Sequence, residues 1–484
     1  MKKIIALVCL LSQIQFGFGQ ITSLEQSLNS LLEKPDMQNA TLGFVVKDLS
    51  NDEIVIAHNE KATLATASTA KLFTTATNLL VFPSDYALRT KVYYTGFVQD
   101  SVLKGDLVIQ GCGDPSLGSK YFYEGEEKYA FIKHWTKAVR TKGIKRITGK
   151  VIADGSAYAY EGIPKDWTWN DMGNYYGAGP AGCTVFDNLM ELHFKTGGVG
   201  TLTKITRVEP ELPNVAFENF VVAAQSNADN AYVYGAPHQN NRYVTGEIPY
   251  NRSDFVVKAS VPDPEYLMAY SFKQALEQEG VEIEGEVEAV HKQRQDLEEI
   301  YKVEDRVVGA FKGKSLLEIA VLTNHKSINL YAEQLLTWLG KDAQGNTSIK
   351  SGLKFINEYW KDKLSSGFEM TDGSGLSRTN RISAQHFVEM LTYMHQSKVM
   401  GEFETTLPIA GVSGTLKYVC NGEAGHGKIK AKSGSLNGVK SYAGYVYGKS
   451  GKKYAFAIVA QNFNTSSRTM VVRFESLFNA IANM

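Results

Sequence analysis

The alternation of apolar and polar residues predicts β-hairpins near both ends of the chain. The runs 41–48 and 53–58 are strand-like and flank a polar Ser-Asn-Asp turn. Near the other end, 442–447 and 454–460 predict a second hairpin, and an amphipathic helix is expected over 468–484. Because both ends carry strands and helices, we expect them to build one layered α+β domain.

An apolar helix is predicted over 72–80, and Ser68-Thr69-Ala70-Lys71 opens it. Residues three apart share a helix face, so the Lys71 amine should lie beside the Ser68 hydroxyl. A serine hydroxyl becomes a nucleophile when a base takes its proton, and a lysine can be that base where burial or other cations lower its pKa. The pattern therefore predicts acyl transfer without a histidine.

The Ser-x-x-Lys spacing is weak evidence by itself, because it recurs at Ser101, Ser351 and Ser450. Two later elements strengthen it: Ser327-Ile328-Asn329 lies in a helix-rich region, and Lys432-Ser433-Gly434-Ser435 precedes the C-terminal hairpin. Ser-x-x-Lys, Ser-x-Asn and Lys-Ser/Thr-Gly, in this order, are the signature of penicillin-binding proteins and class A β-lactamases.

The Lys-Ser-Gly element also has competitors in the sequence. Lys350 begins one copy at the start of a predicted helix, and Lys449 begins another inside a predicted hairpin turn. Only Lys432 precedes a strand hairpin that is followed by a terminal helix. We therefore assign the third element to Lys432.

Ser68 and Ser327 lie far apart in the sequence, so a large insertion is expected between them. Strand-like segments fill this stretch, and the best helix is 264–279. The expected strands are 88–94, 106–110, 148–153, 220–224 and 255–259. We predict one or two β-rich domains at 86–304, inserted into a catalytic domain made of 20–85 and 305–484.

The net charge of the chain is zero, with 51 basic and 51 acidic residues. This balance gives no electrostatic reason to expect nucleic acid or anionic lipid as a partner. The nine histidines include no His-Glu-x-x-His helix, and no Cys-x-x-Cys pair occurs. We therefore expect no metal and no cofactor.

The N-terminus predicts a secretory signal peptide at 1–19, with a basic start, a short apolar core and small residues at its end. No later segment has eighteen consecutive apolar residues, so we expect no transmembrane span in the mature form. The protein is expected to be exported, and periplasmic or cell-wall-associated in a bacterium. Removal of the signal leaves Cys112, Cys183 and Cys420, an odd number, so at least one thiol stays unpaired.

With these residues in hand, the chain resembles the D-alanyl-D-alanine carboxypeptidases/endopeptidases of the low-molecular-mass class C penicillin-binding proteins. The resemblance covers nearly all of the mature chain and includes the large insertion, which class A β-lactamases lack. Further similar stretches are 111–115, 169–172 and 372–378. The resemblance implies an α+β multidomain fold: a β-lactamase/transpeptidase-like catalytic domain, with an antiparallel sheet flanked by helices, and inserted β-rich domains.

The resemblance also implies catalytic roles. Ser68 would attack the carbonyl of the penultimate D-alanine and form an acyl-enzyme, with Lys71 as the base. Ser327 would relay a proton to the leaving amine, and Lys432 would tune the proton affinities of the cluster. Asn329 would hold the substrate amide.

Further residues would bind the substrate. The backbone N–H groups of Ser68 and Ser435 would form an oxyanion hole. Ser433, Gly434 and Ser435 would form the substrate-binding strand, and the two hydroxyls would bind the terminal carboxylate. Ser433 replaces the usual threonine, which keeps the hydroxyl and loses only a methyl group.

The resemblance places a subsite for the free amine of a diamino-acid side chain at Asp171 and Tyr176, with Arg378 and Asn437 lining it. An alternative for Asp171 is a turn-capping aspartate. The implied partners are peptidoglycan peptides, and β-lactam antibiotics as covalent inhibitors.

Several readings stay open at this point. Carboxypeptidase and endopeptidase activity are not separated, and a homo-oligomer is an open alternative. A β-lactamase is less favoured because of the large insertion. A non-catalytic wall-binding protein is less favoured because the motifs are intact, and a broad serine esterase because it would give Asp171 and Arg378 no purpose.

Overall fold

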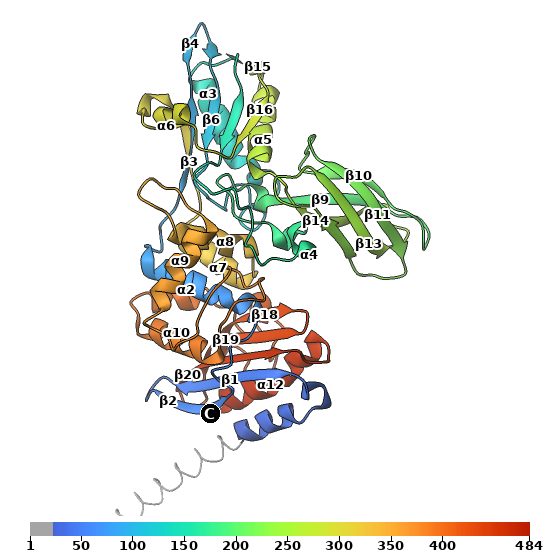
Figure 1. Cartoon of the computed structure of the whole chain (residues 1–484), viewed down its shortest axis with the longest axis vertical. Coiled ribbons are helices and arrows are strands. Elements are labelled where there is room, and N and C mark those ends of the chain that lie inside the picture. The colour runs from blue at the N-terminus through green and yellow to red at the C-terminus, as the bar shows by residue number, and fades with distance from the viewer. Residues whose placement is uncertain (1–22) are drawn as a thin grey trace, which may run out of the picture. The chain divides into compact units, whose positions relative to one another are not determined.

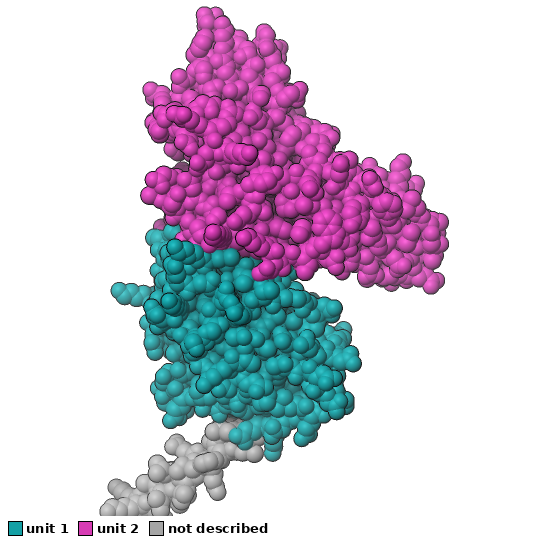
Figure 2. Space-filling model, viewed as in Figure 1, with its two compact units in different colours: residues 1–84, 320–328, 353–484 teal, residues 85–319, 329–352 magenta. Residues whose placement is uncertain are grey.

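The computed structural model describes residues 23–484 in two compact units (Figures 1 and 2). Unit 1 holds the chain up to Ser84, then Ala320–Ile328 and Leu353–Met484, and unit 2 holds Asp85–Ile319 and Asn329–Gly352. The chain therefore enters unit 2 twice and ends in unit 1. The predicted signal peptide, 1–19, lies outside the described residues.

Unit 1 is built on a five-stranded antiparallel sheet with the order β18-β19-β20-β1-β2. Both hairpins predicted from the sequence are present, and β1 joins them because it pairs with β20 from Thr41↔Gln461 to Asp48↔Tyr454. The strands are β1 (Thr41–Asp48), β2 (Glu53–His58), β18 (Ile429–Leu436), β19 (Val439–Tyr447) and β20 (Lys453–Gln461). Residues from the two ends of the chain thus form one sheet, as expected (Figure 1).

Helices cover both faces of this sheet. Side chains three positions apart on a strand point to opposite faces. Tyr442 packs its ring against Phe474 and Phe478 of the terminal helix, whereas the Tyr445 hydroxyl donates to the Leu391 carbonyl on the other side. The two helices are α12 (Ser467–Asn483) and α10 (Ala384–Gln396), and residues 23–32 form a further helix of unit 1. The antiparallel sheet flanked by helices is confirmed.

A buried helix carries the first motif. The 3₁₀ turn η2 (Ala67–Ala70) leads into α2 (Lys71–Val81), whose residues are buried through Leu79. Phe73 lies among the rings of Trp360, Phe368 and Phe387. Other short elements of unit 1 are η1 (Pro35–Met37), α11 (Met400–Thr405) and η7 (Gly414–Leu416). The chain passes between the units within α7 (Leu316–His325) and α9 (Ile349–Trp360).

Unit 2 contains four sheets, which confirms the β-rich character expected for the middle of the chain. One has the order β16-β8-β6-β3-β17, and a second has the order β15-β7-β5-β4. Their strands are β3 (Arg89–Tyr94), β4 (Phe97–Gln99), β5 (Val102–Lys104), β6 (Leu107–Gln110), β7 (Arg146–Ile147), β8 (Val151–Asp154), β15 (Glu282–Ile283), β16 (Val287–Val290) and β17 (Val307–Lys312).

Two helices share a core with these sheets. Trp135 of α3 (Ala130–Thr141) and Phe272 of α5 (Pro264–Gln278) are fully buried, and their rings meet edge to face at 5.6 Å. Helix α5 was expected from the sequence. Helix α3 was not singled out, although its buried face gives it a strong amphipathic pattern.

The other two sheets of unit 2 have three strands each, in the orders β10-β9-β14 and β11-β13-β12. Their strands are β9 (Leu189–Lys195), β10 (Lys204–Glu209), β11 (Ala216–Ala224), β12 (Asn230–Tyr234), β13 (Asn241–Pro249) and β14 (Phe255–Ser260). The remaining helices of unit 2 are η3 (Gly125–Tyr129), α4 (Trp169–Met172), η4 (Tyr175–Gly177), η5 (Phe186–Asn188), α6 (Gln295–Tyr301), η6 (Glu304–Arg306) and α8 (Asn329–Leu339).

Among residues 23–484, no helix is long and apolar enough to cross a bilayer. Cys112, Cys183 and Cys420 are all free thiols. The unpaired thiol expected from the odd count is therefore present.

Candidate active site

The first serine and lysine of the signature are in hydrogen-bond contact. Ser68 lies in the η2 turn, and Lys71 is the first residue of α2. The Lys71 Nζ donates to the Ser68 Oγ at 3.0 Å and to the Ser374 carbonyl at 2.7 Å. The Lys71 side chain is completely buried. A buried amine beside a serine hydroxyl is the arrangement that lets a lysine take the serine proton.

The loop 372–378 positions the Lys71 side chain. The Asp372 carboxylate accepts hydrogen bonds from the backbone N–H groups of Gly375 and Ser377 at 2.8 and 2.7 Å, which folds the loop around it. The loop presents the Ser374 carbonyl to Lys71. Gly375 has φ +80°, and a Cβ there would lie 1.9 Å from the Ala67 carbonyl oxygen, so only glycine fits.

A second serine–lysine pair lies in the same unit. The Lys432 Nζ donates to the Ser327 Oγ at 3.0 Å and to the Ser433 carbonyl at 2.6 Å. Burial, followed by repulsion from Lys71 and Lys440, holds the pKa of Lys432 well below its ordinary value. A lysine in this state gives up its proton readily.

Ser327 adopts an uncommon backbone conformation. Its φ is 60°, in the left-handed region that non-glycine residues rarely occupy. It separates α7 from α8, so the chain turns sharply at this position. Strained conformations of this kind persist where surrounding contacts hold them, often at functional sites.

Strand β18 runs close to the Ser68 turn. A Cβ on Gly434 would lie 2.6 Å from the Thr66 carbonyl oxygen and 3.0 Å from the Ser68 nitrogen. The Ser441 hydroxyl on the neighbouring strand donates to the same Thr66 carbonyl at 2.5 Å. Glycine at 434 therefore permits the close approach that brings the Ser68 N–H next to the strand that carries Ser435.

The hydroxyls of this strand have polar neighbours. Ser433 Oγ donates to Thr415 Oγ1 at 2.8 Å, and Ser435 Oγ accepts from Lys440 Nζ at 2.6 Å. Burial lowers the pKa of Lys440 to about 8. Lys440 was not predicted. Its position in the sequence could have indicated it, because Ser435 and Lys440 are direct partners across the β18–β19 hairpin.

The structure also brings together two exposed residues predicted from the resemblance. Arg378 donates from its guanidinium to the Asn437 backbone carbonyl at 2.9 Å. Asn437 lies in the turn between β18 and β19, beyond Ser435. Both belong to unit 1.

Asp171, Tyr176 and Asn329 belong to unit 2. The Asp171 Oδ2 accepts from the Thr168 N–H at 3.1 Å and from its hydroxyl at 2.7 Å, which caps α4. Asp171 therefore does cap a helix, and both of these bonds fall on one carboxylate oxygen. Tyr176 donates from its hydroxyl to the Asn170 carbonyl at 3.5 Å, and its own carbonyl accepts from Asn329 Nδ2 at 2.8 Å.

The fold of unit 1, with its sheet, its buried nucleophile helix and its serine–lysine pairs, places the protein among the serine hydrolases of the penicillin-binding class. The family model described as the D-Ala-D-Ala carboxypeptidase 3 (S13) family matches residues 24–475, and the chain belongs to this family. The family predicted from the sequence and the prediction of a serine-type hydrolase are both confirmed.

Curated relatives extend over most of the chain. D-alanyl-D-alanine carboxypeptidase DacB of Haemophilus influenzae is 26% identical over 466 residues, covering 92% of this chain and 91% of that protein. D-alanyl-D-alanine carboxypeptidase of Actinomadura sp. is 28% identical over 459 residues, covering 91% of this chain and 81% of its own length.

Solved structures confirm the fold. Penicillin binding protein 4 from Haemophilus influenzae matches with a TM-score of 0.79 and 23% identity, over 96% of this chain and 99% of that one. The same protein complexed with a β-lactam matches with a TM-score of 0.76 and 20% identity, again over 96% and 99%. The predicted α+β class with several β-rich parts is thus confirmed.

Proposed function

We propose that the protein is a D-Ala-D-Ala carboxypeptidase, a DD-endopeptidase or both, acting on peptidoglycan peptides through an acyl-enzyme on Ser68. The observation that carries the proposal is the pair of serine–lysine contacts, Lys71 to Ser68 and Lys432 to Ser327, each at 3.0 Å within unit 1. The names of the curated relatives support the same substrate class.

In the proposed acylation, Lys71 takes the proton of the Ser68 hydroxyl as the oxygen attacks the carbonyl of the penultimate D-alanine. Ser327 relays a proton to the leaving amine, and Lys432 lies beside Ser327 to tune that transfer. The C–N bond breaks and the leaving D-residue departs as a free amine. Water then hydrolyses the ester on Ser68 and regenerates the hydroxyl.

Charge that develops on the carbonyl oxygen needs donors. We assign this role to the backbone N–H groups of Ser68 and Ser435, since Gly434 lets β18 approach the Ser68 turn. Removing one such donor typically costs roughly a hundred- to a thousandfold in rate.

Substrate contacts are assigned along the same strand and in unit 2. The Ser433 and Ser435 hydroxyls would bind the terminal carboxylate, with Gly434 between them on the substrate-binding strand, and Asn329 would hold the peptide amide. Binding of a free side-chain amine is assigned to Asp171 and Tyr176 of unit 2, and separately to Arg378 and Asn437 of unit 1. The Asp171 carboxylate keeps one oxygen outside the α4 cap, which supports a second role.

We further propose that β-lactams acylate Ser68 and that the protein works outside the cytoplasm. A β-lactam complex of the Haemophilus influenzae relative supports the first statement. The predicted signal peptide supports the second. Penicillins resemble the D-Ala-D-Ala terminus, so the same hydroxyl would open their strained ring.

The test is covalent labelling of the purified protein with a fluorescent penicillin. We expect one label per chain in the wild type and none in Ser68→Ala. Ser101→Ala is the matched control, because Ser101 also begins a Ser-x-x-Lys element, and it should label normally. A label that persists in Ser68→Ala would disprove the assignment. Cross-linked and uncross-linked muropeptides, analysed by mass spectrometry, then separate endopeptidase from carboxypeptidase activity.

A further inference from the structure

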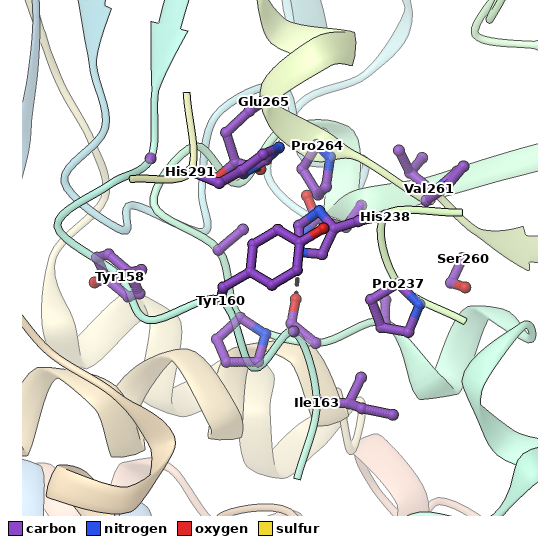
Figure 3. Close-up of a pocket in the computed structure, with 18 of the residues that line it drawn as sticks. Tyr158, Tyr160, Ile163, Pro237, His238, Ser260, Val261, Pro264, Glu265 and His291 are labelled. Atoms are coloured by element: carbon purple, nitrogen blue, oxygen red, sulfur yellow. Dashed lines mark hydrogen bonds and ion pairs between the residues drawn. The ribbon is translucent and has the colours of Figure 1, made fainter. Parts of the chain in front are cut away.

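A small pocket in unit 2 is lined by two histidines, His238 and His291, and by one carboxylate, Glu265. Its volume is about 40 Å³, which is room for an ion and a water rather than a peptide. Figure 3 shows the Tyr160 ring over His238, with His291 and Glu265 on the same side of the pocket. None of these residues belongs to the machinery assigned to peptide hydrolysis.

The two lining histidines converge with Asp263, which lies between the lining residues Pro262 and Pro264, as metal ligands do. His238, Asp263 and His291 each offer one ligand atom, and these atoms all lie within 4.8 Å of one another. The His291 Nε2 is 3.1 Å from the Asp263 Oδ2, and the two imidazole centroids are 4.5 Å apart. Two imidazoles and one carboxylate form a ligand set that Zn²⁺ commonly takes in proteins.

The backbone holds Asp263 in a fixed position. It is the N-cap of α5, and its Oδ1 accepts from the Tyr266 N–H at 3.0 Å. That bond sets the rotamer and leaves Oδ2 as the oxygen beside His291. The carboxylate is therefore oriented by the helix before any ion arrives.

The position of His238 is also fixed by its surroundings, although its backbone conformation is unfavourable. Its φ is 58°, a left-handed conformation, and its N–H donates to the Pro262 carbonyl at 2.8 Å. The Arg242 guanidinium donates to the carbonyls of Gly235 and Ala236, which holds the loop that ends at His238. The Tyr160 ring stacks on the imidazole, with centroids 4.1 Å apart. Strained backbone conformations of this kind are found most often at functional sites.

One atom of this cluster lacks a partner among the described residues. The Nδ1 of His238 is buried and makes no hydrogen bond within residues 23–484. A buried polar atom without a partner is destabilising and calls for an explanation, such as an ion that occupies the space in front of it.

We propose that His238, Asp263 and His291 bind one divalent transition-metal ion, best matched by Zn²⁺, in unit 2. The His238 Nδ1, the Asp263 Oδ2 and the His291 Nε2 supply three ligands, and water takes the fourth position. Glu265 Oε2 lies 3.9 Å from the His291 Nδ1 and would orient that ring from behind.

The ion would tie three separate elements of unit 2 together: the 235–238 loop, the start of α5 and the residue after β16. The three ligand residues are far apart in the sequence, so no short sequence motif indicates them. This is why the sequence suggested no metal. The site goes beyond the proposed function, since no step of the peptide hydrolysis uses it.

The test uses the full chain, made without a histidine tag and freed of metal with a chelator. Zinc chloride is added during isothermal titration calorimetry, and the expected result is one Zn²⁺ bound per chain. Thermal unfolding is measured separately and should give a higher Tm with Zn²⁺ than without it. Co²⁺ is added separately, and strong visible absorption is expected, as four-coordinate Co²⁺ gives. The Co²⁺ spectrum is recorded on the wild type alone. A weak spectrum, typical of six-coordinate Co²⁺, would be enough to overturn the proposal.

Variants localise the ion. His238→Gln and His291→Gln should each weaken Zn²⁺ binding about a hundredfold or more, because even loss of an outer partner of a ligand costs about 10–100-fold. The matched control is His193→Gln, in the group Glu191, His193 and Glu209, which also places ligand atoms within 4.8 Å of one another. It should bind Zn²⁺ normally.

Unchanged binding in both pocket variants, or loss in His193→Gln, would overturn the proposal. Penicillin labelling of Ser68 in each variant separates this outcome from failure of the proposed function. A chain that labels normally and binds no Zn²⁺ contradicts only the metal site.

Discussion

At the scale of single residues, the base assigned to acylation can be tested directly. Replacing Lys71 with methionine fills the same buried space but removes the amine beside Ser68. A positioned general base contributes about 10²–10⁴-fold, so acylation should slow by at least that factor. Stopped-flow labelling with penicillin measures the rate, and Ser327→Ala should slow it less. Equal rates in the wild type and Lys71→Met would exclude Lys71 as the base.

Lys440 gives a prediction about pH. Its pKa of about 8 means that the amine beside Ser435 is a cation below that pH and neutral above it. If the cation helps to hold a terminal carboxylate, the KM for a D-Ala-D-Ala peptide should rise as the pH passes upward through about 8. Lys440→Arg keeps its charge at high pH and should lose this rise. Identical KM profiles in the wild type and Lys440→Arg would contradict the role.

Asp171 can be separated from its capping role. Asp171→Asn should lower kcat/KM for peptides with a free side-chain amine by roughly tenfold to a hundredfold, since a charge-assisted hydrogen bond contributes about 1.5–3 kcal/mol. Penicillin acylation should barely change. Thr168→Ala is the control, because it removes the hydroxyl that donates to Asp171 Oδ2 in the α4 cap, keeps the backbone N–H bond and leaves the carboxylate. A parallel loss with both substrates would mean that Asp171 supports the fold only.

At the scale of elements, the approach of β18 to the η2 turn depends on Gly434. Gly434→Ala would place a Cβ against the Thr66 carbonyl and the Ser68 nitrogen and push the strand outward. A displacement of about 1 Å near reacting atoms can cost about a hundredfold, so we expect a loss of that order in acylation rate. Gly401→Ala in α11 is the control, because a Cβ there meets open space. Comparable rates in the two variants would show that the strand tolerates the methyl group.

The elements that follow local patterns were predictable from the sequence. Alternation and turn residues predicted the β1–β2 and β19–β20 hairpins, and an amphipathic pattern predicted α12. The Ser68–Lys71 contact followed from helical spacing. What needed the fold was the left-handed φ of Ser327, which no local preference favours, and the pairing of Lys440 with Ser435, which depends on strand register. The convergence of His238, Asp263 and His291 likewise depends on three separate elements.

At the scale of the whole molecule, unit 1 is discontinuous in the sequence. Its strand β1 lies near the N-terminus and pairs with the central strand β20, which ends at Gln461. Contacts between residues so far apart are slow to form, because closing the long intervening loop costs conformational entropy before the contact is gained. Most of unit 2, in contrast, is one continuous stretch, Asp85–Ile319.

This arrangement controls when the protein can first act during its own synthesis. Ser68 is made early, but Lys432 and strand β18 emerge only near the end, and β1 has no β20 to pair with until then. A growing chain therefore carries the proposed nucleophile, Ser68, for most of translation without Lys432, which is assigned to assist it. The proposed hydrolytic activity would therefore begin only after the last strands have joined the sheet, and an incomplete copy released by the ribosome would be inactive.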